Sequence, residues 1–419
     1  MAISLNLDAN TFSALKSNSF KIYLASQFVA VSGIWVQRIA TSWLVYNMTA
    51  SATKLGVIEL ITNIPIFIFG LLAGAWLEKH DVRKTMLTTQ SLAMTYSIIM
   101  AMLIYSNTIT FSYIVALNLS LGIITAIDMP ARQSSILLMI ENKKSLKSAL
   151  ALQSMTFNVA RFVGPSIGGL IVYNFGEATC FSITAICYIP VIYALYIIRL
   201  KERDTTSIKD QSIIKGVIDG IIYVKNFYPL LIMFIFLASF GMFSYSYNVF
   251  FPIFAKDILG GSSRFLGIIM GLFGLGAIIG AFSVASIMQF RSLPKSIAIV
   301  SLLYSICIAI FAISTNNILS LIIVIPAGLG LVATFIGTST LIQTIARIDM
   351  RSRVISLYTI CNLGLGPIGC FFAGFIIDYL NPQHTVLLWC LCMASISIIL
   401  LKQVQKINKE LEPIWNNLD

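Results

Sequence analysis

Two arginines stand out because each interrupts a long apolar stretch of the sequence. Arg38 follows Trp35 at helical spacing, and Arg161 follows Asn158 in the same way. Charged side chains inside an apolar span are costly, and they usually face the protein interior or a water-filled cavity. A guanidinium group presents several hydrogen-bond donors to an anion. Arg38 and Arg161 are therefore candidates for binding an anionic small molecule, and hydrogen bonding within the protein is the alternative.

Acidic residues also occur inside the apolar stretches. Glu59 allows two interpretations: a structural ion pair with Arg38, or a carboxyl group that binds and releases a coupling proton. Burial raises the pKa of a carboxyl group and a nearby arginine lowers it, so the sequence leaves both roles open. Asp128 and Arg132 lie four residues apart. This spacing favours a structural pair that gates the cytoplasmic side.

Aromatic residues recur at near-helical spacing in the stretch 228–255. They are Phe240, Phe243, Tyr247, Phe250 and Phe254. Such a stripe either packs against lipid and other helices or forms one wall of a binding cleft. In the second interpretation, Phe243 and Tyr247 form an aromatic wall opposite the cationic side chains, which suits bulky amphipathic anions.

Helices must position these residues, and the sequence predicts twelve of them. A helix that crosses a bilayer needs about 20 mostly apolar residues. Stretches of this kind lie near residues 19–47, 55–78, 86–106, 111–131, 147–173, 178–199, 228–255, 262–290, 296–314, 318–344, 353–379 and 384–402. The predicted fold class is an all-α membrane protein with 12 transmembrane helices.

The basic residues predict the direction in which these helices cross the membrane. Most of the 28 Lys and Arg residues lie in alternate gaps between the apolar stretches, whereas the other gaps hold only Lys54, Lys256 and Arg264. Cytoplasmic loops are enriched in Lys and Arg. Both termini are therefore predicted to be cytoplasmic, in a multi-pass protein of the cytoplasmic (inner) membrane.

The composition excludes several other classes of protein. Hydrophobic residues make up 58% of the chain and charged residues 11%, which does not fit a soluble domain. The net charge of +11 is spread over gaps that flank the apolar stretches, so we expect no nucleic-acid partner. The 7 cysteines and 2 histidines lack metal-site spacing, and the sequence has no phosphate-binding Gly-Lys loop and no Ser/His/Asp set. We therefore expect no metal, no cofactor and no enzymatic activity.

The chain divides into two halves joined by a polar segment. The predicted parts are a six-helix bundle over 1–199, a cytoplasmic linker with an interfacial helix over 200–226, a second six-helix bundle over 227–402 and a cytoplasmic tail over 403–419. Gly164-Pro165 in the first half is echoed by Gly366-Pro367 in the second. Parallel halves with a substrate site between them are a known transporter plan, so the two bundles are predicted to be pseudo-symmetric.

Four segments, in chain order, resemble the major facilitator superfamily, and more narrowly its drug- and siderophore-exporting branch. They are 33–46 (GIWVQRIATSWLVY), 128–133 (DMPARQ), 252–260 (PIFAKDILG) and 351–354 (RSRV). The resemblance covers essentially the whole chain. It implies the major facilitator fold and transport by alternating access.

The superfamily's loop between the second and third spans is similar to one segment of this chain. Gly74, Glu78, Lys79, Asp81 and Arg83 occupy positions in that motif, with Asp81 in place of the usual glycine. The resemblance gives this loop a role in conformational gating. It also suggests that Glu78 pairs with Arg132.

Gly164 and Pro165 begin a segment, 164–169, that resembles a fifth-span motif of exporters. The resemblance therefore implies export, and proton antiport as the energy source. We expect a monomeric secondary exporter that moves a siderophore or a similar amphipathic or anionic small molecule. Its partners would be this substrate, protons and the lipid bilayer. The alternative is a multidrug efflux antiporter for lipophilic drugs.

Overall fold

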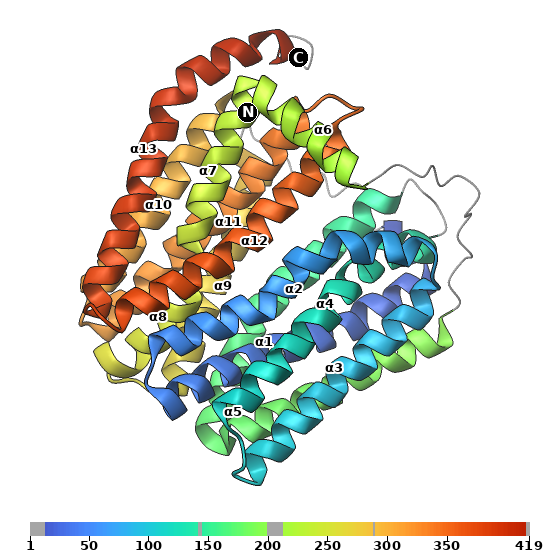
Figure 1. Ribbon diagram of the computed structural model, residues 1–419, viewed down its shortest axis with the longest axis vertical. Coiled ribbons are helices and arrows are strands. Elements are labelled where there is room, and N and C mark those ends of the chain that lie inside the picture. Colours follow the sequence, from blue (N-terminus) through green and yellow to red (C-terminus); the bar gives the residue numbers. More distant parts are fainter. Residues whose placement is uncertain (1–12, 141–144, 199–212, 288–289, 416–419) are drawn as a thin grey trace. The chain divides into compact units, whose positions relative to one another are not determined.

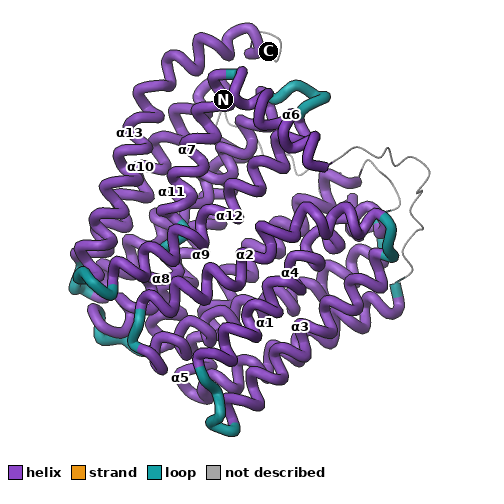
Figure 2. Tube along the Cα trace, viewed as in Figure 1, coloured by secondary structure: helices purple, strands orange, loops and turns teal. Residues whose placement is uncertain are grey.

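A computed structural model describes residues 13–140, 145–198, 213–287 and 290–415. These residues form helices joined by short loops, and none of them belongs to a β-strand (Figure 1, Figure 2). The predicted all-α fold is confirmed. The polar part of the predicted linker, 200–212, lies outside the described residues.

The helices follow one another closely along the chain. The first half contains η1 (Ser13–Lys16), α1 (Asn18–Thr49), α2 (Ala52–Glu78), α3 (Val82–Tyr105), α4 (Phe111–Met139) and α5 (Leu146–Ile197). The second half contains α6 (Ile213–Asn226), α7 (Tyr228–Ser244), α8 (Tyr247–Ile253), η4 (Phe254–Ile258), α9 (Ser263–Ile287), η5 (Phe290–Ser292), α10 (Leu293–Ile313), α11 (Asn317–Ile345), α12 (Arg351–Ile377) and α13 (Pro382–Trp415).

The predicted membrane spans are present as helices. In the described part of the chain, 11 helical stretches are long and apolar enough to cross a bilayer. The fifth of these has 50 residues and contains two predicted spans, because Gly176 interrupts α5 with φ 80° and ψ 170°. Glycine adopts a positive φ without the steric penalty of a side chain. The two spans therefore follow each other through a turn at one residue.

The chain consists of two compact units. Unit 1 comprises Met1–Ala50, Ile61–Lys209 and Gly261–Gly271. Unit 2 comprises Ser51–Leu60, Asp210–Gly260 and Leu272–Asp419. Each unit contains one six-span half of the chain and a short segment from the other half. Helices α2 and α9 consequently have residues in both units.

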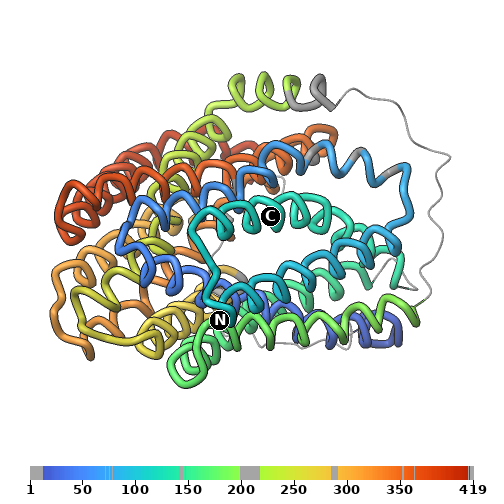
Figure 3. Tube along the Cα trace, turned by 60° about the horizontal axis from the view of Figure 1, so that its bottom comes forward, coloured from blue at the N-terminus to red at the C-terminus, as the bar shows by residue number. Residues whose placement is uncertain are grey.

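In unit 1 the long helices α1, α3, α4 and α5 lie side by side, as two views show (Figure 1, Figure 3). The most extensive packing joins α1 to α5, and α3 packs on α4 and α5. Glycines make the α1–α5 approach close: a Cβ added at Gly164 would lie 2.5 Å from the Trp35 Cβ, and one at Gly168 would lie 3.0 Å from the Val36 Cα. Small residues at helix crossings allow such packing in membranes.

Unit 2 has a comparable arrangement. Helix α10 packs on α11 and α13, and α7 packs on α12 and α13. Outside this group, α6 forms the helix predicted for the interface, and its Ile218, Ile221 and Ile222 are exposed. Asp219 of α6 pairs with Arg353 of α12 at 3.0 Å. Helix α6 therefore presents an apolar surface while one of its polar residues holds it to α12.

The predicted stretch 228–255 lies in one apolar helical stretch, Tyr228–Ile258, but the helix is interrupted at Tyr245 and Ser246. Helix α7 ends at Ser244 and α8 begins at Tyr247, so Phe243 and Tyr247 belong to different helices. Two side chains satisfy the backbone at the break. The Tyr304 hydroxyl of α10 donates to the Ser244 carbonyl at 2.7 Å, and the local Asn248 side-chain amide donates to the Tyr245 carbonyl at 3.1 Å. Broken helices survive at membrane depth only when the freed backbone groups find such partners.

The start of α2 is capped from another helix of unit 2. The Asp378 carboxylate follows α12 and accepts hydrogen bonds from the Ser51 hydroxyl at 2.7 Å and from the amides of Ala52 at 2.8 Å and Thr53 at 3.0 Å. A carboxylate at a helix N-terminus satisfies amides that have no partner inside the helix and interacts favourably with the helix dipole. Asp378 therefore fixes residues 51–60 to unit 2.

We expect Asp378→Ala to lower the free energy of unfolding by about 1 kcal/mol or more, as for other lost helix caps. Burial raises the pKa of the Asp378 carboxyl group, but hydrogen bonds from Thr53, Ser51 and Ala52 outweigh this effect and leave the pKa lowered. A group whose pKa is lower in the folded state stabilises the fold above its unfolded pKa of about 3.9, and this stabilisation is lost as the pH falls below that value.

Thermal unfolding in detergent between neutral and acidic pH measures this effect. The matched control is Asp349→Ala, because Asp349 is exposed and pairs only across the surface with Arg347. Equal unfolding temperatures for the two variants at neutral pH would contradict the capping role.

Candidate functional site

Two of the predicted site arginines share one aromatic partner in unit 1. The Arg38 Cζ lies 5.4 Å from the centroid of the Trp35 ring, and the Arg161 Cζ lies 5.2 Å from the same centroid. All three side chains are half-buried. These distances are within the range of cation–π attraction. We call Arg38, Trp35 and Arg161 the arginine–tryptophan cluster.

The sequence positions this cluster through the α1–α5 crossing. Trp35 and Arg38 are one turn apart on α1. Gly164 is one turn after Arg161 on α5, and its missing side chain allows the backbone there to approach the Trp35 Cβ. Pro165 follows directly, and because proline has no N–H, the Arg161 carbonyl does not receive the regular helical hydrogen bond. The Gly-Pro pair thus brings Arg161 onto the Trp35 ring.

The cluster concentrates positive charge in a largely apolar environment. Both guanidinium groups are attracted by the same indole ring, and they repel each other because they carry the same charge. A guanidinium group also offers planar donors that can bind a carboxylate with two hydrogen bonds. The arrangement is therefore suited to a carboxylate, and a substrate with two carboxylates can engage both arginines.

Two residues of α5 that precede Arg161 in the sequence, Phe157 and Asn158, also have defined contacts. Asn158 is half-buried, and its amide donates to the Ser154 carbonyl at 2.9 Å. The Phe157 ring lies 5.6 Å from the Arg132 Cζ. The hydrogen bond to Ser154 uses the side-chain NH2 group of Asn158 and not its carbonyl oxygen. Phe157 is the aromatic partner of a different arginine, Arg132.

The two predicted aromatic wall residues have different environments in unit 2. Tyr247 is 3% exposed and packs against Phe273 with ring centroids 4.6 Å apart, so it belongs to the core of the unit. Phe243 is half-buried and meets Trp389 edge to face at 5.4 Å. The sequence did not single out Tyr245, which is half-buried and donates its hydroxyl hydrogen to Asn362 Oδ1 at 3.2 Å. Phe243 remains a candidate for contact with substrate, whereas Tyr247 has a packing role.

Glu59 is half-buried in the part of α2 that belongs to unit 2, whereas Arg38 belongs to unit 1. The predicted pairing of these two residues, and a role for Glu59 in proton coupling, stay predictions.

The predicted gating loop makes defined contacts within unit 1. Asp81 is the N-cap of α3 and accepts from the Lys84 amide at 3.1 Å. Arg83 donates through Nε to the Leu195 carbonyl at 2.6 Å, and through Nη2 to the Tyr196 carbonyl. Arginine at a helix C-terminus satisfies carbonyls that lack a partner. Asp81 therefore has a capping role at a position where the motif usually has glycine.

Other members of the loop contribute less to its structure. Lys79 is exposed, and a Cβ added at Gly74 would meet no atom within 4 Å. The side chain of Glu78 lies outside the described residues, so its pairing with Arg132 and the gating role of the loop stay predictions.

Asp128 and Arg132 form an ion pair in the C-terminal half of α4, with side chains that are 5% and 12% exposed, respectively. The sequence did not reveal their other partners on α3. The Thr89 hydroxyl and the Gln90 amide each donate to Asp128 Oδ1 at 2.8 Å. The sequence of α3 carries several polar residues besides Thr89 and Gln90, so it gave no distinct signal for this contact. Among the described residues, no three His, Cys, Asp or Glu side chains are grouped closely enough to hold a metal ion.

Comparison with solved structures identifies the fold. A crystal structure of the nucleoside transporter NupG matches with a TM-score of 0.72 at 15% sequence identity, over 93% of this chain and 99% of that chain. A crystal structure of the peptide transporter POT matches with a TM-score of 0.73 at 13% identity, over 94% and 95%. At such low identity the likeness concerns the fold alone. The fold is that of the major facilitator superfamily.

The family model for transmembrane secretion effectors matches residues 9–416, so the chain belongs to this family. The staphyloferrin A transporter of Staphylococcus aureus is 25% identical over 398 residues, which cover 94% of this chain and 98% of that protein. The multidrug efflux pump Tap of Mycolicibacterium fortuitum is 22% identical over 394 residues, which cover 92% and 95%. The protein is therefore a multi-pass efflux transporter of the superfamily's siderophore and drug exporter branch.

Proposed function

We propose that the protein exports a carboxylate-rich siderophore, or a similar amphipathic anion, in exchange for protons. The observation that carries this proposal is the arginine–tryptophan cluster, in which Arg38 and Arg161 are both held against Trp35. A positive charge within a membrane-spanning helix has an energetic cost, and such residues usually mark a functional site. A substrate with several carboxylates would use both arginines.

The similarity to a staphyloferrin A transporter supports a siderophore as substrate. Gaps between the apolar stretches that are rich in Lys and Arg alternate with gaps that have few, and this pattern supports a cytoplasmic location for both termini. Glu59 and Asp128 lie within predicted spans and carry carboxyl groups that can bind a proton, and their presence supports proton coupling. We expect the protein to act as a monomer, with alternating access around a path lined in part by the arginine–tryptophan cluster.

A secretion assay tests the substrate class. Cells that contain staphyloferrin A and the wild-type protein are expected to release it into the medium faster than cells carrying an Arg38→Gln, Arg161→Gln double variant. Membrane insertion of each protein is checked by immunoblotting of the membrane fraction. Equal release by both strains would refute the proposed anion site.

A multidrug efflux antiporter is the second candidate. The half-buried Phe243 and its edge-to-face partner Trp389 favour it, because aromatic surfaces bind lipophilic drugs. Ethidium accumulation distinguishes the candidates: a drug pump lowers accumulation in intact cells, and a Phe243→Ala variant loses this effect. A siderophore exporter leaves ethidium accumulation unchanged.

A further inference from the structure

A buried carboxylate in unit 1 lies in an unusual polar environment. Asp128 is 4% exposed and accepts hydrogen bonds from Thr89, Gln90 and Arg132. Three oxygen or nitrogen donors on two helices thus converge on one carboxyl group inside a helical bundle. The ordinary role of such an arrangement is structural, and a fully satisfied network would be expected for that role.

The network around Asp128 is not fully satisfied. Gln90 Oε1 and Arg132 Nε are buried and have no hydrogen-bond partner among the described residues. Neither amide atom of Gln27 has a partner, although Gln27 is fully buried on α1, one turn after Tyr23. Buried polar groups without partners oppose folding. The atoms of Gln90 and Arg132 belong to residues that bind Asp128, so we interpret this network as one whose hydrogen bonds change during function.

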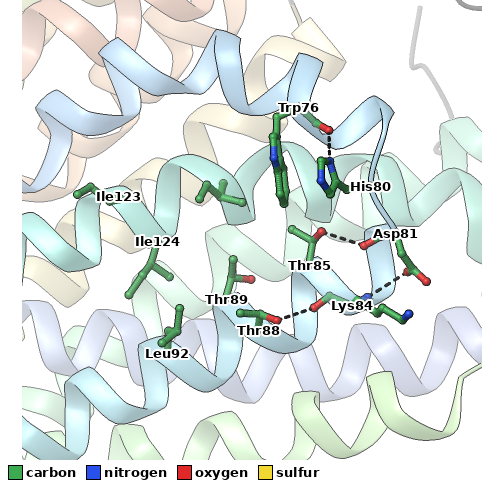
Figure 4. A pocket seen from close by; sticks show the side chains of 11 residues that line it. Trp76, His80, Asp81, Lys84, Thr85, Thr88, Thr89, Leu92, Ile123 and Ile124 are labelled. Atoms are coloured by element: carbon green, nitrogen blue, oxygen red, sulfur yellow. Dashed lines mark hydrogen bonds between the residues drawn. The ribbon is translucent and has the colours of Figure 1, made fainter.

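A pocket of unit 1 lies next to this network. The pocket has a volume of about 330 Å³ and lies at the start of α3, with Trp76 and His80 on one side and Ile123 and Ile124 of α4 on another (Figure 4). Thr89 is one of its lining residues, and the Thr89 hydroxyl donates to Asp128 Oδ1. Thr89 therefore lines the pocket and contacts the buried carboxylate.

We infer that Asp128 is the group that binds the exchanged proton, and that the pocket at the start of α3 is its route to the cytoplasm. This inference rests on the proposed proton antiport and on the predicted cytoplasmic position of the loop at 79–84. It assigns to Asp128 a role for which the sequence offered Glu59 as one candidate.

The proposed step is a simple proton transfer. A proton adds to a carboxylate oxygen of Asp128 and forms a neutral carboxylic acid. The ion pair with Arg132 is then lost, and the net charge of Asp128 and Arg132 together rises by one. Arg132 keeps its contact with Phe157 of α5. The other groups that face the pair are Tyr23 from α1, Tyr188 from α5, and the uncharged Thr89 and Gln90 from α3. Release of the proton restores the ion pair.

Infrared difference spectroscopy of the purified protein, between acidic and alkaline buffer, tests this assignment without any substrate. The wild type is expected to show the carbonyl stretch of a protonated buried carboxyl group. Asp128→Asn removes this band. Thr89→Val leaves the band but shifts it to higher frequency, because a hydrogen bond to the carboxyl group is lost. Glu59→Gln and the matched exposed control Glu410→Gln leave it unchanged. A wild type without the band, a band that persists in Asp128→Asn, or a band lost in Glu59→Gln would overturn the inference.

Transport in proteoliposomes supplies the functional test, with staphyloferrin A as the probe. In Asp128→Asn we expect exchange of staphyloferrin A across the membrane to continue, whereas the accumulation ratio driven by a pH gradient falls to about 1, because a transporter that cannot bind the proton cannot couple to it. Gradient-driven accumulation at the wild-type level would contradict the inference. If the wild type does not exchange staphyloferrin A, the proposed substrate is wrong, and the infrared experiment still decides the role of Asp128.

Discussion

Arg161→Gln is expected to lower the export rate by about tenfold or more, and Arg38→Gln by a similar factor. Each substitution removes a cation from the Trp35 ring. A hydrogen bond that involves a charged group contributes about 1.5–3 kcal/mol, and 1.4 kcal/mol corresponds to a factor of ten. The loss in a partly desolvated site should lie at the upper end of this range.

Lysine variants separate charge from geometry. Arg161→Lys keeps the positive charge but loses the planar group that stacks on the indole and binds a carboxylate with two hydrogen bonds. We therefore expect an intermediate export rate for this variant. If charge alone mattered, the lysine variant would match the wild type.

The measurement is export of labelled substrate from cells or from inverted membrane vesicles, normalised to the amount of protein in the membrane. Arg347→Gln is the matched control, because Arg347 is exposed on unit 2 and pairs only with Asp349. Export at the wild-type rate by both the Arg38 and the Arg161 variants would remove the basis for an anionic substrate.

Gly276→Ala is expected to destabilise the protein by about 3 kcal/mol or more, since overpacking a tight helix contact forces the backbones apart. Gly276 of α9 faces α11 within unit 2, and a Cβ added there would overlap the Ile325 carbonyl oxygen. The contact is reciprocal, because a Cβ added at Gly328 of α11 would overlap the Phe273 carbonyl oxygen. Backbone atoms meet on both sides, so no side-chain rotation can relieve the clash.

Gly70→Ala is the control for this substitution. Gly70 lies inside α2, and an added Cβ there meets no atom within 4 Å. Alanine is favoured over glycine in a helix by about 1 kcal/mol, so this variant should be as stable as the wild type or more stable. The measurements are the yield of monodisperse protein in detergent and its unfolding temperature. A stable Gly276→Ala protein would show that α9 and α11 do not pack as described.

The spans and the first half of the candidate site could be predicted from the sequence because both depend on local patterns. Apolar length and alternating basic gaps located the helices. The spacing of Trp35 and Arg38 placed them on one face of α1, and the charge of Arg161 inside an apolar span marked it as a functional candidate. Their meeting at one ring required a close approach of α5 at Gly164, which depends on contacts between helices.

Other features could not be predicted because distant residues create them. The break after Ser244 contains neither Gly nor Pro, and the Tyr304 hydroxyl of α10 stabilises it by binding the freed carbonyl. A regular aromatic spacing therefore indicated a continuous helix that the fold does not contain. The hydrogen bonds from Thr89 and Gln90 to Asp128 also join separate helices, and the capping of α2 by Asp378 joins residues 326 positions apart.

The turn at Gly176 has a practical consequence for studying this protein. Because the chain reverses there within one residue, it offers no loop in which a protease site, an antibody epitope or a fluorescent tag could be inserted without displacing the helices on both sides. Insertions belong instead in the short connection between α3 and α4 at residues 107–110, where the backbone is not helical.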